Sequence, residues 1–167
     1  MAHMTALDDK NQKDRAPQAT DWRAGAWAGL IAGLVFMMAE MLMVMIVQGQ
    51  SPWGPPRMMA AMALGQQVLP PPADFDVKIM MVAMMIHIPL AIVYGLAIGW
   101  IVHRFETGIA LAVGGVIGLV IYLVNFYPIA AAVFPWFAMA RGWVSAMAHI
   151  LFGLVAAGAY VALRKRA

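Results

Sequence analysis

Four long apolar stretches alternate with short polar segments along this chain. The apolar stretches cover 24–47, 79–102, 108–124 and 142–163, and only a few polar residues interrupt them. A helix crosses the hydrocarbon core of a membrane with about 20 mostly apolar residues. The pattern therefore predicts an all-α protein with four transmembrane helices packed as a bundle. We expect these helices at about 24–48, 77–103, 108–127 and 142–164.

The polar segments define a tail and one long loop. Residues 1–22 are polar and carry both signs of charge, which predicts a cytoplasmic tail rather than a signal peptide, ahead of a single membrane domain over 23–166. In the loop at 49–76, two groups of prolines bracket the segment 57–69. This segment is too short to span, so we expect a short helix on the outer surface or over the bundle.

The two halves of the chain resemble each other. The segment that ends at Glu40 aligns with the segment that ends at Asn125, and Gly29 and Gly33 fall opposite Gly114 and Gly118. His87 and its following isoleucine correspond in the same way to His149 and its neighbour. The pattern predicts two repeated helical hairpins of the same orientation.

Composition requires a lipid environment. Hydrophobic residues make up 63% of the chain and charged residues 11%, against about 45–50% and about 25% in soluble domains. The absence of cysteine excludes disulfides and thiolate metal sites. No basic stripe with interleaved aromatic residues is present, so nucleic acid is not an expected partner.

The basic residues predict the orientation. Of the 11 Lys and Arg residues, only Arg57, Lys78 and Arg141 fall on the side of the long loop. The others flank the opposite helix ends and occupy both termini. Because positive charge accumulates in cytoplasmic segments, both termini are predicted to be cytoplasmic.

Each apolar stretch carries one strongly polar residue, in chain order Glu40, His87, Asn125 and His149. Such groups are costly in hydrocarbon, which makes them functional-site candidates. At about 1.5 Å per residue, Glu40 and the two histidines lie about 10–15 Å below the outer boundary, and Asn125 about one turn higher. One polar group per helix at similar depth predicts a site in the bundle core.

A metal site is one chemistry that fits these residues. Glu40, His87 and His149 form a two-histidine, one-carboxylate set that suits iron, zinc or copper. Asn125 would be a weak ligand or a residue that orients a ligand. The thioether of Met84, on the face of His87, would favour copper(I).

Three other interpretations remain open. A b-type haem could be held between His87 and His149, which lie on diagonal helices of an up-down bundle. The polar layer could instead relay protons or solute through a hydrated pocket. A buried Glu–His pair could also do no more than fix the helix register. Ser145 lies one turn before His149 on the same face, which alone does not indicate a nucleophile.

Two short motifs suggest a class of protein. The sequences Gly29-Leu-Ile-Ala-Gly33 and Ala148-His-Ile-Leu-Phe-Gly153 are similar to segments of small bacterial four-helix integral membrane proteins of unknown function. This resemblance implies a four-helix fold and a location in the bacterial inner membrane. It implies no activity.

The expected function follows from the small mass outside the membrane. Motifs of soluble enzymes are absent, so we do not expect an enzyme on its own. The leading hypothesis is a subunit or accessory protein of a larger inner-membrane assembly, respiratory or metal-handling, whose partners are the lipid bilayer and other membrane subunits or further copies of itself. The alternative is a small oligomeric transporter or channel that uses the same polar layer.

Overall fold

The computed structural model describes residues 19–164, and within this range the chain is helical, with no strand. Four long helices are each long and apolar enough to cross a membrane, which confirms the predicted helical fold. They are α2 (Trp22–Gln48), α4 (Val77–Val102), α5 (Thr107–Val124) and α7 (Trp143–Leu163). The predicted tail lies mostly outside the described residues.

The outer surface of the bundle is apolar along all four helices. Large side chains such as Met38, Val93, Val116 and Met147 are exposed by 48–64%. A soluble monomer rarely exposes apolar surface on this scale. These faces are therefore suited to contact with lipid.

Local sequence explains where two of the helices begin. Asp21 caps α2, because its carboxylate accepts a hydrogen bond from the Ala24 amide at 3.0 Å. Asp76 caps α4 in the same way, with the Ile79 amide at 3.0 Å. At its other end, α2 stops at Gly49, whose φ of 64° is a left-handed conformation that glycine adopts readily.

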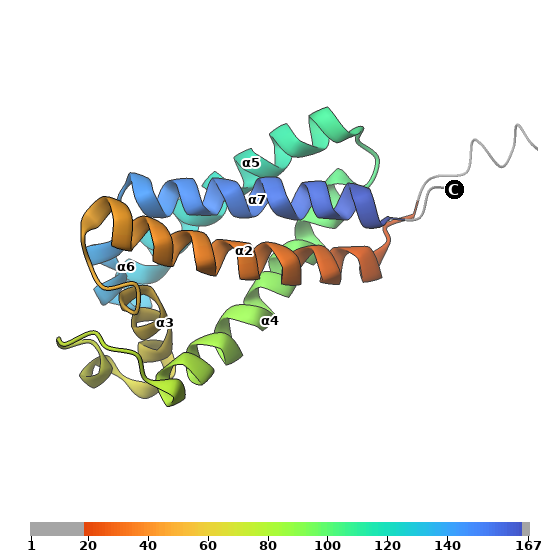
Figure 1. The fold of residues 1–167 in the computed structure, drawn as a ribbon. Helices are drawn as coiled ribbons and strands as arrows, with labels where there is room; N and C mark the ends of the chain where they lie inside the picture. Colours follow the sequence, from red (N-terminus) through yellow and green to blue (C-terminus); the bar gives the residue numbers. More distant parts are fainter. Residues whose placement is uncertain (1–18, 165–167) are drawn as a thin grey trace, which may run out of the picture.

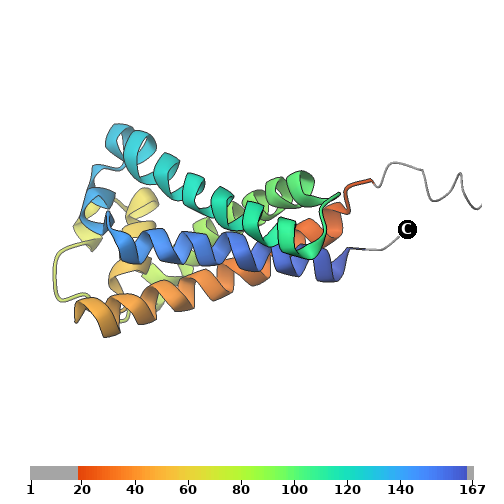
Figure 2. The same cartoon turned by 90° about the horizontal axis from the view of Figure 1, so that it is seen from above.

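The helices pack in the order α4, α2, α7, α5, and α4 touches α5 only slightly. Glycines allow the closest approaches. A Cβ on Gly29 would lie 2.8 Å from Ile92 Cα, and one on Gly114 would overlap the Gly153 carbonyl oxygen. Figures 1 and 2 show both ends of the described chain at one end of the bundle. The predicted cytoplasmic location of the termini stays a prediction, and so does the internal repeat.

A short helix fills the space between α2 and α4 where these helices diverge (Figure 1). This helix, α3 (Gly54–Leu64), starts before the predicted segment and is followed by the 3₁₀ turn η1 (Gln66–Val68). The Arg57 guanidinium donates to the carbonyl oxygens of Asp74, at 2.8 Å, and Val68, at 3.0 Å. The Trp136 indole donates to the Met58 carbonyl at 3.1 Å. These bonds hold α3 as a cover on the bundle.

The third spanning helix continues further than the sequence predicted. Past α5, a wide π-helical turn η2 (Asn125–Ile129) leads into α6 (Ala130–Val133), so that the span reaches Val133. Pro128 has no amide hydrogen to donate, which accounts for an irregular turn here. The chain returns through the 3₁₀ segment η3 (Pro135–Ala140), and Arg141 donates to the Phe126 carbonyl at 2.9 Å.

Candidate functional site

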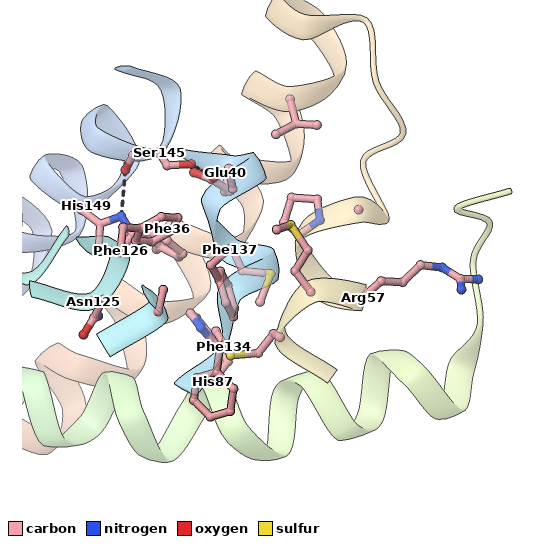
Figure 3. A pocket seen from close by; sticks show the side chains of 18 of the residues that line it. Phe36, Glu40, Arg57, His87, Asn125, Phe126, Phe134, Phe137, Ser145 and His149 are labelled. Carbon is pink, nitrogen blue, oxygen red and sulfur yellow. Dashed lines mark hydrogen bonds between the residues drawn. The ribbon is translucent and has the colours of Figure 1, made fainter. Parts of the chain in front are cut away.

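The four polar residues of the predicted layer line one cavity of about 510 Å³. α2, α4 and α7 supply its walls together with the η2 turn, and α3 and η3 cover it. Figure 3 shows Glu40, His87, Asn125 and His149 around this space. Apolar side chains form most of the lining, including Phe36, Met37, Val44, Ile121, Phe126 and Phe137.

Glu40 is bonded on one oxygen only. It lies on α2 and is 6% exposed, and the Ser145 hydroxyl of α7 donates to Oε1 at 2.6 Å. Oε2 is buried and has no hydrogen-bond partner within residues 19–164. Buried polar atoms are nearly always paired, and a buried carboxylate without a partner is costly. Glu40, which lines the cavity, therefore has one acceptor oxygen that no described residue binds.

His149 donates to its own helix. Its Nδ1 lies 2.7 Å from the Ser145 carbonyl oxygen, one turn earlier. Because a carbonyl oxygen can only accept, Nδ1 carries the hydrogen, and the neutral ring presents Nε2 as an acceptor. Aromatic rings surround the imidazole, with Phe36 at a centroid distance of 4.8 Å and Phe126 at 5.4 Å.

His87 is fixed from the neighbouring helix. Its Nε2 donates to the Gly33 carbonyl oxygen at 2.8 Å, so the neutral ring keeps Nδ1 as its acceptor. Gly33 is required here, since a Cβ would come 2.6 Å from Ala91 Cβ. Phe36 stacks against the imidazole at a centroid distance of 5.6 Å and an interplanar angle of 23°.

Asn125 stands at the start of the π-helical turn and links two helices that otherwise barely touch. The Tyr94 hydroxyl of α4 donates to its Oδ1 at 2.9 Å. The amide nitrogen of Asn125 remains as a donor beside the cavity. Among the described lining residues, the one cation is Arg57. Its guanidinium binds the loop carbonyls described above and points away from Glu40 (Figure 3).

The predicted metal ligands share the cavity without forming a cluster. Within residues 19–164, no three His, Asp or Glu side chains are placed to hold a metal ion. Met84 is not among the lining side chains. The Phe36 ring contacts both imidazoles, so a haem between His87 and His149 would have to displace it. The metal and haem sites stay predictions that this arrangement does not favour.

Several residues of the site were not assigned to it from sequence. Phe36 lies one turn before Glu40, and this spacing could have placed it on the inner face. The sequence places Ser145 one turn before His149, but its bond to Glu40 depends on α2 and α7 being neighbours. Phe134 and Phe137 come from irregular segments that have no hydrophobic period, so no sequence signal could place them.

Comparison with protein-family models, with curated proteins and with solved structures finds no match for this chain.

Proposed function

We propose that this protein binds a small, mostly apolar solute inside its helical bundle, as the binding site of a small membrane transporter. The observation that carries this proposal is the cavity of about 510 Å³ with Glu40 Oε2 left unpaired beside it. Ligand sites typically occupy about 300–1,000 Å³, with apolar walls and a few polar groups that orient the ligand. The cavity has this character.

The hydrogen-bond pattern supports a binding site over a purely structural contact. A polar pair that only fixes helix register would be expected to satisfy its own hydrogen bonds and to pack closely. Glu40, His87 and His149 each make a hydrogen bond to the protein through one polar atom. The second polar atom of each side chain has no hydrogen bond within the described residues. These unbonded polar atoms are suited to hydrogen bonds with a ligand.

Closure of the bundle at one end supports transport. Near the two ends of the described chain, Ile98, Val102 and Tyr160 are almost completely buried, and the Tyr160 ring lies against Gly99. The cavity lies toward α3, at the opposite end. A site that is closed toward one end of the helical bundle is typical of one state of an alternating-access carrier. Membership of a larger assembly stays a prediction.

A ligand screen with a cavity-filling variant tests this function. The protein in lipid nanodiscs would be heated with a panel of small aromatic amines, alcohols and carboxylates. Val44 lines the cavity one turn after Glu40, so Val44→Trp should abolish any ligand-induced rise in Tm. Val47→Trp, on the exposed side of α2, is the matched control and should respond like wild type. A panel that never stabilises wild type, or that stabilises Val44→Trp equally, would overturn the proposal.

A further inference from the structure

Most of the polar atoms of the cavity that have no partner are hydrogen-bond acceptors. Glu40 Oε2 is unpaired within the described chain, and the neutral rings of His87 and His149 present Nδ1 and Nε2. The hydroxyl donors are already occupied, since Ser145 donates to Glu40 and Tyr94 donates to Asn125. A ligand that donates several hydrogen bonds would match this surplus.

The charges point in the same direction. A carboxylate at this depth is stable when a cation pairs with it. Among the described lining residues only Arg57 is cationic, and its guanidinium is bound to the carbonyls of Val68 and Asp74. The protein therefore offers Glu40 no counter-ion within the cavity. A positively charged ligand would supply one.

The walls suit a cation that has an apolar body. Phe36 is one turn from Glu40 and contacts both imidazoles, while Phe126 and Phe137 pack edge to face at 5.7 Å. The faces of such rings attract ammonium groups. On the α3 side, the lining includes the flexible thioethers of Met58, Met59 and Met62, which adapt to different apolar shapes.

We propose that the solute is a lipophilic primary or secondary ammonium, with Glu40 as its counter-ion. One N–H group would donate to Glu40 Oε2, and a second would donate to the free nitrogen of one of the two imidazoles. The apolar body would lie among the phenylalanines and methionines. This inference rests on the proposed solute-binding function and specifies its ligand.

Four ligands with the same aromatic body test the inference. Calorimetry on the protein in nanodiscs, with empty nanodiscs subtracted, would compare phenethylammonium, phenethyl alcohol, phenylpropanoate and phenethyltrimethylammonium. Hydrogen bonds to charged groups are worth enough that phenethylammonium should bind at least about tenfold more tightly than the alcohol. The quaternary ion, which lacks N–H donors, should bind more weakly than phenethylammonium, and the carboxylate should not bind.

Variants assign the preference to Glu40. Glu40→Gln should bind phenethylammonium and the alcohol with nearly equal Kd, whereas Glu40→Asp should retain the preference. Glu106→Gln removes an exposed carboxylate at the start of α5 and should behave like wild type. If Glu40→Gln does not fold, the ligand series on the wild-type protein tests the preference for an ammonium, and slower carbodiimide modification of Glu40 in the presence of phenethylammonium tests the contact with this residue.

The outcomes separate the two proposals. Binding of the alcohol or the carboxylate as tightly as phenethylammonium, with loss in Val44→Trp, would overturn the ammonium inference and support solute binding. No binding of any of the four compounds would overturn the ammonium inference, and the wider ligand panel would then decide the proposed function. A preference for phenethylammonium that persists in Glu40→Gln would show that Glu40 is not the counter-ion.

Discussion

The hydrogen bond between Ser145 and Glu40 is a short, buried contact between α2 and α7, and its energy can be measured. The perturbation is Ser145→Ala, combined with Glu40→Met in a double-mutant cycle. The O···O distance is 2.6 Å, and the two side chains are 3% and 6% exposed. Hydrogen bonds between membrane helices average about 0.6 kcal/mol and reach about 1.7.

A short, buried bond to a carboxyl group should fall in the upper part of that range. We therefore expect a coupling free energy of about 1.5 kcal/mol. The assay is equilibrium unfolding of the four proteins of the cycle in mixed micelles, followed by tryptophan fluorescence. Ser145→Ala should be destabilising alone and nearly neutral when Glu40 is already Met. A coupling below about 0.4 kcal/mol, within the error of additivity, would refute this reasoning.

Three further predictions concern packing and the cover of the cavity. Phe36→Ala removes the ring between the two histidines and should lower the free energy of unfolding by about 3 kcal/mol, measured in the same unfolding assay. Gly118→Val should prevent close packing of α5 on α7, because a Cβ would overlap the His149 carbonyl oxygen. Gly108→Val, whose side chain would lie in open space, should fold normally. Gel filtration and Tm distinguish the two variants. Arg57→Met should release the loop after α3, because the guanidinium binds its carbonyl oxygens. Amide hydrogen exchange should become faster over residues 66–76, with little change in α7. Unchanged exchange over residues 66–76 would contradict the role of Arg57.

The spanning helices could be predicted because their signal is one of length and composition. Each of the four apolar stretches is longer than a buried soluble helix needs, and the four helices are long and apolar enough to cross a membrane. The predicted helix ends lie within a few residues of the observed ones where a capping residue such as Asp76 marks the end. The third helix extends beyond its predicted end, since the backbone around Pro128 depends on neighbours such as Arg141, which donates to the Phe126 carbonyl oxygen.

The candidate site could be predicted only in part. Helical spacing and depth indicated that Glu40, His87 and His149 could face one interior, and the three do line one cavity. Their separation by Phe36 could not be predicted, because it depends on the distance between helices and on one rotamer. A short helix over the bundle was among the expectations for 57–69, but the side chains of α3 and η3 that line the cavity could not be identified, because such short segments carry little periodic signal.

Chemical labelling of Glu40 tests most directly whether this cavity binds a solute. A hydrophobic carbodiimide would be added to the protein in nanodiscs, and the labelled residues would be identified by peptide mass spectrometry. Glu40 should be modified in wild type, and phenethylammonium or another stabilising compound should slow its modification, while the exposed Glu106 reacts at an unchanged rate. Modification of Glu40 at the same rate with and without every compound of the panel would contradict the account.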